Sequence, residues 1–316
     1  MSRGVRSGNL TPMSSAASSA PTAPPFGRLT TAMITPFRTD GSLDLEAAQK
    51  VAGHLVDQGN DALIVNGTTG EAPTTSDQEK DQLVRAVLEA VGDRAQVVAG
   101  VGTNDTAHTI ALAQAAEAAG AHGLLVVTPY YNKPPQEGLK AHFTAVADAT
   151  GLPNLLYDIP GRSGVEIRTE TLIALADHPR IVAVKDAKGD VVAAAKVLAN
   201  TDLAYYCGAD ELNLAWLAIG AAGIASVVAH VASPQYRQLI DAAVAGDLAT
   251  ARELDRRLIP AVEAIMTRTQ GAIMVKAALK LLGVTEHATV RLPLVEATTA
   301  QVDGLTTDLK TSGLVA

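Results

Sequence analysis

The chain has 316 residues, of which 47% are hydrophobic and 18% are charged, and its formal net charge is -8. This composition is typical of a globular protein with a large core, and an acidic balance without a Lys/Arg cluster argues against a nucleic-acid partner. The single cysteine, Cys207, excludes an internal disulfide and fits a reducing cytoplasm, and no apolar run approaches the ~18 to 20 residues of a membrane span.

The first 27 residues differ in composition from the rest of the chain. Residues 1–27 are rich in Ser, Ala, Pro and Thr, contain no acidic residue, and hold four prolines that interrupt any amphipathic helix. We therefore expect a disordered N-terminal extension over residues 1–27. The basic residues Arg3 and Arg6 leave an organellar transit peptide as the alternative.

From Gly27 onward, short apolar runs alternate with Ala-rich segments of helical periodicity. Runs of four to seven residues bounded by turn residues predict strands. The eight expected strands cover residues 29–35, 62–66, 97–101, 123–128, 154–159, 181–186, 204–207 and 224–228.

The segments between these strands carry helix signals. Asp44 can cap the first helix, and Ser76 with Glu79 three residues later forms a capping box that opens the second. Further helices are expected over residues 106–119, 136–149, 168–176, 190–199, 210–219 and 234–245. This α/β alternation predicts a TIM (β/α)8 barrel over residues 28–246, with an open doubly wound sheet as the alternative.

Beyond Gly246 the pattern contains helices only. They are expected over residues 248–258, 261–268 and 273–282, with a last helix after Pro293. Because no long linker separates them from the barrel, residues 247–316 are predicted to form a helical appendage packed on it.

One predicted strand carries a lysine within an apolar run. Residues 181–186 have the continuous apolarity of a parallel strand that is buried on both faces. Alternation places Lys185 on the face of the small residues Ala183 and Ala187, and the two valines of the run, Val182 and Val184, share the other face. Burial lowers the pKa of a lysine, and the neutral amine can attack a ketone to form a Schiff base. A structural ion pair, for example with the adjacent Asp186, is the alternative.

Further polar and aromatic residues follow other strands, at the barrel end where active sites of this fold lie. The turn Gly67-Thr68-Thr69-Gly70 offers hydroxyls and backbone N–H groups to a carboxylate. Tyr157 faces inward by alternation and can carry protons, and Arg162 can hold a carboxylate with its guanidinium fork. Each feature also has a purely structural alternative. The turn can be an ordinary glycine turn, Tyr157 a packed phenol and Arg162 a surface arginine. The glycines of Gly100-Val101-Gly102 are interpreted as structural, and Cys207 as a core residue.

No metal or cofactor is expected. The seven histidines are scattered and fall into no metal-ligand spacing, and no carboxylate cluster suggests a metal. A protonated lysine imine is itself an electron sink, so Schiff-base chemistry needs no additional group.

Four motifs together resemble a known family. They are Gly67-Thr68-Thr69-Gly70-Glu71, Thr128-Pro129-Tyr130-Tyr131-Asn132, Tyr157-Asp158-Ile159-Pro160-Gly161-Arg162-Ser163-Gly164 and Val184-Lys185-Asp186. The set resembles the dihydrodipicolinate synthase (4-hydroxy-tetrahydrodipicolinate synthase) family of pyruvate-dependent Schiff-base aldolases. The likeness extends from Gly27 to the C-terminal helices.

The resemblance implies a role for each motif. Lys185 would form the imine with pyruvate, Tyr157 would relay protons, and Thr69 would hold the pyruvate carboxylate in the turn that Gly67 begins. Thr68 would link Tyr157 to Tyr131 of a neighbouring subunit. Two further positions are implied at the substrates, namely Arg162 on the carboxylate of L-aspartate 4-semialdehyde and Ala225 through its backbone carbonyl. The family's activity is the first committed step of diaminopimelate and lysine biosynthesis, and its usual assembly is a homotetramer of tight dimers in the cytoplasm, without nucleic-acid or membrane partners.

This chain departs from the family pattern at several positions. Asp158 stands where asparagine is more frequent, and Ala225 where a larger aliphatic residue is often found. The positions that match the family's lysine-inhibitor site are Ala72, Asp77, Lys80, Asn104, His108 and Tyr130. Lys80 would repel a cationic inhibitor, and His108 replaces a glutamate that would bind its ammonium group, so weak or absent feedback by lysine is expected.

Three other functions are compatible with parts of the sequence. N-acetylneuraminate lyase and 2-keto-3-deoxygluconate aldolase share the lysine, the tyrosine and the Gly-x-Thr-Gly-Glu signal, but Arg162 favours a substrate with a carboxylate over a sugar chain. A barrel that binds a keto acid without turnover is the remaining alternative, and the full set of reactive residues argues against it.

Overall fold

The computed structural model describes residues 23–315. Its strands form a closed barrel in chain order, from β1 through β8. The strands are β1 (Leu29–Ala32), β2 (Ala62–Val65), β3 (Gln96–Gly100), β4 (Gly123–Val127), β5 (Asn154–Asp158), β6 (Ile181–Asp186), β7 (Ala204–Cys207) and β8 (Gly223–Ser226). All neighbours are parallel, including β1 and β8, which close the ring. The structure therefore confirms the TIM barrel and excludes the open doubly wound sheet.

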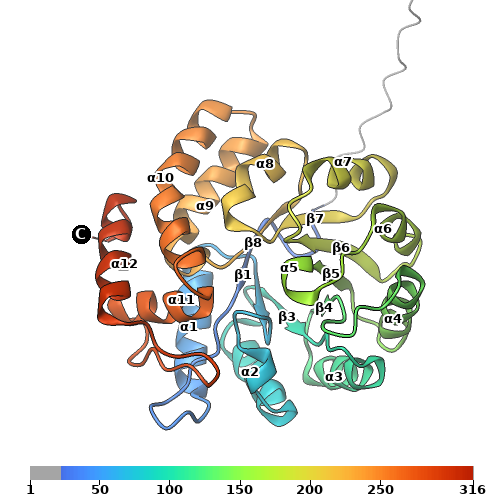
Figure 1. Cartoon of the computed structure of the whole chain (residues 1–316), viewed down its shortest axis with the longest axis horizontal. Coiled ribbons are helices and arrows are strands. Elements are labelled where there is room, and N and C mark those ends of the chain that lie inside the picture. The colour runs from blue at the N-terminus through green and yellow to red at the C-terminus, as the bar shows by residue number, and fades with distance from the viewer. Residues whose placement is uncertain (1–22, 316) are drawn as a thin grey trace, which may run out of the picture.

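Helices surround the barrel and extend it on one side (Figure 1). They are α1 (Leu45–Asp57), α2 (Asp77–Val91), α3 (Thr106–Ala119), α4 (Gln136–Asp148), α5 (Pro160–Ser163), α6 (Thr169–Leu175), α7 (Val191–Asn200), α8 (Asn213–Ala218), α9 (Ala229–Val244), α10 (Leu248–Met266), α11 (Gly271–Leu281) and α12 (Thr299–Thr311), with 3-10 turns η1 (Ala72–Thr74) and η2 (Asp210–Leu212). The expected caps are present, because Asp44 accepts a hydrogen bond from the backbone of Ala47 and Ser76 and Glu79 form a reciprocal capping box. Among the described residues, none of these helices is both long and apolar enough to cross a membrane.

Three helices that contain prolines differ from the bounds expected from the sequence. The expected helices 248–258 and 261–268 are one helix, α10, which continues through Pro260 because its apolar face is buried on both sides of the proline. Helix α9 begins at Ala229, five residues before the expected start at Pro234, and is kinked at Ala232. The short helix α5, which begins at Pro160, was not expected.

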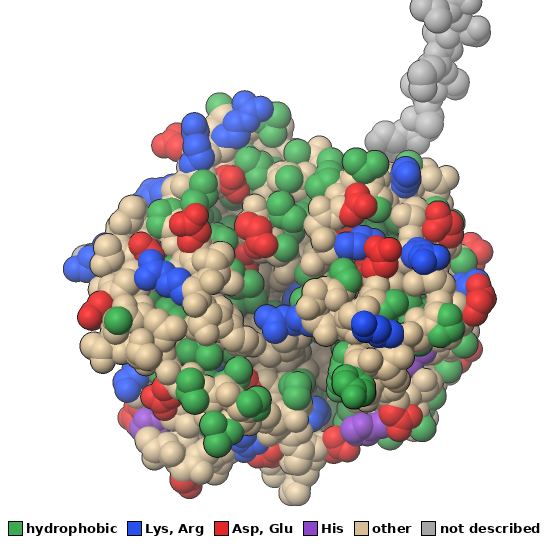
Figure 2. Space-filling view, in the orientation of Figure 1, with side chains coloured by type: hydrophobic (Ala, Val, Ile, Leu, Met, Phe, Trp, Pro, Cys, Tyr) green, Lys and Arg blue, Asp and Glu red, His purple; other side chains and the backbone are tan. Residues whose placement is uncertain are grey.

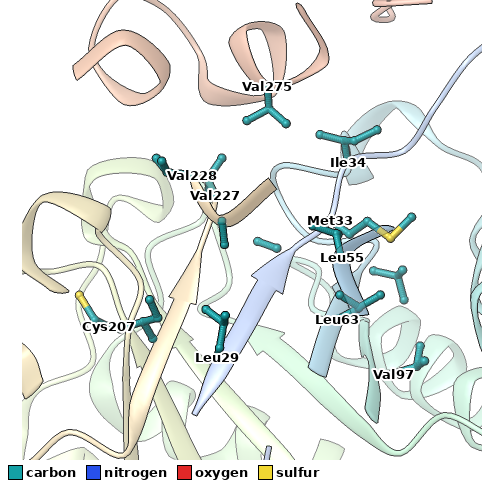
Figure 3. Close-up of a cluster of buried hydrophobic side chains, with 14 of the residues drawn as sticks. Leu29, Met33, Ile34, Leu55, Leu63, Val97, Cys207, Val227, Val228 and Val275 are labelled. Atoms are coloured by element: carbon teal, nitrogen blue, oxygen red, sulfur yellow. The ribbon is translucent and has the colours of Figure 1, made fainter. Parts of the chain in front are cut away.

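The apolar side chains form two separate cores. An outer core lies between the strands and the surrounding helices, and Figure 3 shows part of it, where Val275 of α11 faces Val227 and Val228 after β8. A smaller inner core fills the barrel and includes Leu155, Tyr157 and Ala225. The two faces of each strand therefore serve different cores, which explains the continuous apolar runs.

The inner core also corrects two sequence-based expectations. Phe26 is fully buried in it and its backbone N–H donates to the Tyr206 hydroxyl at 3.0 Å, so the expected extension 1–27 reaches too far, while residues 1–22 of it lie outside the described residues. Val182 packs against this inner core instead of sharing the outer face with Val184, because the register between β5 and β6 shifts beside Asn154.

The C-terminal helices belong to the folded body of the protein. Helices α9 to α12 gather on one side of the barrel, and α11 is buried over nearly its whole length (Figure 1). The appendage expected over residues 247–316 therefore packs against the barrel as far as the structure describes it.

Candidate active site

Lys185 lies inside the barrel on β6, with a side chain that is almost fully buried. Its Nζ is 4.6 Å from the centre of the Tyr157 ring, which is provided by the neighbouring strand β5. The two residues are paired in register, so the strand alternation directs both side chains inward. This convergence of the amine and the phenol agrees with the inward positions expected from strand alternation.

Space for the lysine is provided by a glycine that the sequence analysis overlooked. A Cβ atom at Gly208, just after β7, would lie 3.0 Å from both Cγ and Cε of Lys185. Any larger residue there would press on the lysine stem and displace the amine. The only sequence signal for this role is the position of Gly208 directly after a strand.

Burial changes the protonation of this amine. Desolvation lowers the pKa of Lys185 to about 8, and the nearby Asp210 opposes the shift. At pH 7 roughly one lysine in ten would then be neutral, compared with about one in 3,000 at the ordinary value. A neutral amine is the form that attacks a carbonyl carbon, so the site favours a nucleophilic lysine.

Asp210 is the second residue that the sequence analysis did not assign to the site. Its buried carboxylate accepts hydrogen bonds from the backbone of Val227 and Val228 and from the Ser226 hydroxyl. Asp210 thereby ties the end of β8 to the loop after β7 and provides a negative charge near Lys185. Asp210 comes shortly after the end of β7, and this position in the sequence indicates a place near the active-site end of the barrel.

Tyr157 is buried beside the lysine. Burial raises the pKa of Tyr157 to about 12, while the Arg162 guanidinium and the Thr68 hydroxyl both favour the phenolate and limit the shift. The phenol is therefore protonated at neutral pH and can donate a proton to a reacting oxygen.

The threonine turn after β2 is held in an unusual backbone conformation. Glu71, at its end, has φ 55°, in the left-handed region that non-glycine residues seldom adopt. The Thr35 hydroxyl donates to the carbonyl of Gly70 at 2.7 Å, and Thr69 is buried. A Cβ atom at Gly100 would lie 2.4 Å from the carbonyl oxygen of Asn66, so the glycine interpreted as structural permits the close approach of this turn.

A large cavity opens beside these residues. It has a volume of about 810 Å³, and of the sequence-predicted site residues it is lined by Gly67, Thr68, Tyr131, Tyr157 and Arg162. Figure 2 shows a hollow near the middle of the visible face, with basic side chains at its rim. Such a cavity can hold small substrates, and the basic rim suits anionic ones.

Three predicted site residues lie below the cavity surface. Lys185, Thr69 and Ala225 are all buried and none of them lines the cavity. Ala225 lies on β8 in the inner core. The structure thus brings Lys185 and Tyr157 together and places the remaining residues around them at different depths.

Two residues of the rim come from the loops after β4 and β5. Arg162 is exposed on α5, and its charge acts on Tyr157. Tyr131 has φ 73° and its side chain is 88% exposed, while its backbone N–H donates to the carbonyl of Ser163. An aromatic side chain fixed on a strained backbone and directed to solvent suits contact with another molecule.

The positions expected to match an inhibitor site line the same cavity. They are Ala72, Asp77, Lys80, Asn104, His108 and Tyr130. His108 Nε2 and Asp77 Oδ2 are 2.9 Å apart, and the Lys80 ammonium donates to the carbonyl of Thr75. The cavity therefore extends from Tyr157 and Arg162 to this polar end.

A pair of buried carboxyl groups lies behind the site. Asp158 and Asp186 occupy paired positions on β5 and β6, and the Lys188 ammonium is 3.4 Å from Asp158 Oδ2. Asp158 also accepts a hydrogen bond from the backbone of Ile167. Burial raises the pKa of Asp158 to about 7, with Lys188 opposing the shift and Asp186 adding to it, and burial also raises the pKa of Asp186.

We expect Asp158→Asn to stabilise the protein at alkaline pH. Because the folded chain holds the Asp158 proton up to about pH 7 and the unfolded chain releases it near 4, the wild type loses stability as the pH rises between these values. The variant avoids this loss, which is on the order of 4 kcal/mol when the two pKa values differ by about three. Denaturant unfolding at pH 5 and pH 8, with the exposed Asp202→Asn as control, should show an advantage that grows with pH; an advantage independent of pH would contradict the assignment.

Two other expectations from the sequence concern the single cysteine and metal binding. Cys207 is fully buried in the outer core, and burial raises the pKa of its thiol well above the ordinary value, so it is a poor nucleophile. Within residues 23–315, no group of three or more His, Cys, Asp or Glu side chains is arranged to hold a metal ion.

Comparisons with known proteins identify the family of this chain. The model of the dihydrodipicolinate synthetase family matches residues 25–312. The chain is 63% identical to 4-hydroxy-tetrahydrodipicolinate synthase of Kineococcus radiotolerans, over 92% of this chain and 94% of that protein, and 61% identical to 4-hydroxy-tetrahydrodipicolinate synthase 2 of Streptomyces coelicolor, over 92% and 96%. The crystal structure of the Cyanidioschyzon merolae enzyme with lysine bound superposes with a TM-score of 0.89 at 39% identity, covering 92% of this chain and 100% of that one. The chain belongs to the dihydrodipicolinate synthetase family.

Proposed function

We propose that this chain is a 4-hydroxy-tetrahydrodipicolinate synthase, a lyase that condenses pyruvate with L-aspartate 4-semialdehyde. The observation that carries the proposal is the buried amine of Lys185, 4.6 Å from the centre of the ring of Tyr157, whose phenol interacts with the Thr68 hydroxyl. The similarity to named synthases over most of the chain supports the same reaction.

The reaction begins with attack of the neutral Lys185 Nζ on the ketone carbon of pyruvate. The carbinolamine loses water and becomes an imine, with Tyr157 delivering the proton that the departing hydroxyl needs. Thr69 and the backbone of Gly67 hold the pyruvate carboxylate, and the backbone carbonyl of Ala225 contributes to the same site. No separate cofactor or metal is required, because the protonated imine withdraws electrons from the methyl group.

The second half of the reaction joins the two substrates. Loss of a methyl proton converts the imine to an enamine, whose carbon attacks the aldehyde carbon of the semialdehyde and forms the new C–C bond. Arg162 holds the carboxylate of this substrate by paired hydrogen bonds. The substrate's amino group then attacks the imine carbon, which releases Lys185 and closes the ring.

Borohydride reduction of the imine tests the proposed function directly. Purified protein incubated with pyruvate and borohydride should gain the mass of one reduced pyruvate adduct on Lys185 in peptide mass spectrometry. A parallel assay should offer aspartate semialdehyde, N-acetylneuraminate and 2-keto-3-deoxygluconate to separate the synthase from its two relatives. Turnover of either sugar acid in preference to the semialdehyde would overturn the assignment, and an adduct without condensation would indicate a binding protein.

Replacing Arg162 with alanine should selectively weaken the binding of the second substrate, aspartate semialdehyde. Loss of a bidentate guanidinium–carboxylate contact is expected to raise the KM for aspartate semialdehyde by roughly 10- to 100-fold, because hydrogen bonds to charged groups contribute about 1.5–3 kcal/mol. The pyruvate adduct should still form. Steady-state kinetics with each substrate varied in turn checks this, with Arg168→Ala, on the following loop, as the control.

Feedback by lysine is expected to be weak or absent. At the polar end of the cavity, Lys80 places a cation where a cationic inhibitor would bind, and His108 is already paired with Asp77. Assays of the purified enzyme should show no inhibition by lysine below roughly 1 mM. Specific sites for metabolites usually bind their ligands below about this concentration. The variant His108→Glu, which restores an anion, should gain sensitivity; inhibition of the wild type at submillimolar lysine would contradict the prediction.

The assembly follows from the same proposal. Tyr131 would reach the site of a neighbouring subunit and meet Tyr157 through Thr68, which requires a tight dimer, doubled into a homotetramer. The exposure of Tyr131 in the single chain supports such a contact. The single buried cysteine and the absence of a spanning helix among the described residues fit the cytoplasmic location that we propose.

A further inference from the structure

The turn that carries Thr68 and Thr69 ends at a buried carboxylate whose partners come from the C-terminal region. The Glu71 side chain is buried, and its Oε1 accepts a hydrogen bond from the Lys276 ammonium of α11, which is also buried. Its Oε2 accepts a hydrogen bond from the backbone N–H of Arg291 at 2.9 Å. Both carboxylate oxygens of Glu71 therefore accept hydrogen bonds from residues that are more than 200 positions away from it in the sequence.

Lys276 is fixed by a second set of contacts. Its ammonium also donates to the carbonyl of Thr289 at 2.8 Å and lies 4.2 Å from the centre of the Phe37 ring. Helix α11, which carries Lys276, is buried nearly throughout. A buried lysine with this many partners cannot turn toward water, so it holds the Glu71 carboxylate in one place.

Arg291 ties the same turn to the neighbouring elements. Its guanidinium carbon also lies 4.2 Å from the centre of the Phe37 ring, and the guanidinium donates to the carbonyl of Thr74 at 2.7 Å. It also donates to both carboxylate oxygens of Glu79, the capping-box residue at the start of α2. The segment from Glu71 to Glu79 is thus clamped at both ends by residues of the C-terminal region.

The clamp acts on the residues proposed to bind pyruvate. Glu71 adopts the left-handed backbone at φ 55°, and its N–H donates to the carbonyl of Thr68 at 3.1 Å. A conformation of this kind persists only when surrounding contacts enforce it. If Glu71 lost its partners, the backbone could relax and move Thr68 and Thr69 relative to Lys185.

We propose that Lys276 and Arg291 are positioning residues, through which the C-terminal helical region holds the threonine turn in its pyruvate-binding geometry by way of Glu71. The proposal rests on the proposed function for the identity of the ligand. It assigns the C-terminal helices a part in substrate binding in addition to their packing on the barrel.

Two variants separate positioning from stability. Lys276→Met alone leaves the Glu71 carboxylate buried without its cation, so this variant is expected to lower the thermal midpoint and can fail to fold. The double variant Glu71→Gln/Lys276→Met removes both charges and is expected to recover most of the midpoint, because a neutral buried pair has no uncompensated charge. Lys280→Met, exposed one turn further along α11, is the matched control.

The double variant is the decisive one. We expect its KM for pyruvate to rise by roughly 10- to 100-fold, the range that small misplacements of binding groups cost, while the KM for aspartate semialdehyde stays unchanged because Arg162 is on a different loop. Backbone amide exchange in the peptide 66–75 should become at least ~10-fold faster, with exchange in α10 unchanged. The control should match the wild type in all three measurements.

Opposite results would overturn the proposal. A double variant with a recovered midpoint, wild-type pyruvate KM and wild-type exchange in residues 66–75 would show that the buried pair only stabilises the fold. Equal increases in both KM values would point to a general distortion. The exchange measurement does not depend on turnover. If the wild type formed no pyruvate adduct, the proposed function would fail, but the exchange in residues 66–75 would still show whether Lys276 and Glu71 hold the turn.

Discussion

Replacing Lys185 with alanine is expected to abolish turnover, with kcat falling by at least ~10³-fold, because loss of a covalent nucleophile removes the whole reaction path that depends on it. The pyruvate adduct should also disappear after borohydride reduction. Lys185→Arg should be equally inactive, because a guanidinium stays protonated and cannot form an imine. Both variants should be measured with saturating substrates and by mass spectrometry of the reduced protein.

The control for Lys185 is Lys196→Ala, which removes an exposed lysine of α7. It should retain activity and the adduct. The protein folds around a desolvated amine, so Lys185→Ala is not expected to lose stability through an unpaired charge. Residual adduct formation in Lys185→Ala at the wild-type rate would mean that a different amine is the nucleophile.

Replacing Tyr157 with phenylalanine should slow the reaction strongly without removing the nucleophile. General acid–base catalysis contributes roughly 10²–10⁴-fold, so kcat should fall within that range when the phenolic proton is lost. The adduct should still form, but more slowly, because water or the carbinolamine itself must then supply the proton. Pre-steady-state measurement of imine formation, alongside kcat, checks this expectation.

The same substitution on β7, two strands away from Tyr157, provides the control. Tyr205 is buried on β7 but belongs to the outer core, so Tyr205→Phe should leave imine formation unchanged. If Tyr157→Phe formed the imine at the wild-type rate, the phenol would serve packing only and the lysine would obtain its protons from elsewhere.

The sequence predicted the barrel because its signals are local and repeated. A closed parallel barrel needs short strands buried on both faces, and continuous apolar runs such as residues 181–186 show this directly. A helix cap such as Asp44 depends only on residues close to it in the sequence, so the predicted cap at the start of α1 is confirmed. Prolines were less informative, because Pro260 is accommodated inside a helix whose apolar face is buried on both sides of it.

The sequence also predicted which reactive side chains meet at the site. Strand alternation directs Tyr157 and Lys185 inward, and adjacent parallel strands bring residues at equal depth together. The same rule failed at Val182, where a register shift between β5 and β6 changes the face. Alternation cannot reveal such a shift, because the sequence of one strand does not record its pairing with the next.

What the sequence determined by itself is therefore the architecture and the meeting of Lys185 with Tyr157 inside the barrel, since both follow from short-range periodicity. The chemistry assigned to these residues stays a prediction. Only the tertiary structure decided how the turn ending at Glu71 is held, because Lys276 is 205 positions away and lies in a helix whose pattern reads as an ordinary buried face. The sequence places Gly208 directly after a strand, but only the structure shows that it leaves space for Lys185. Contacts between distant segments depend on how complete elements pack, and no local pattern encodes that packing.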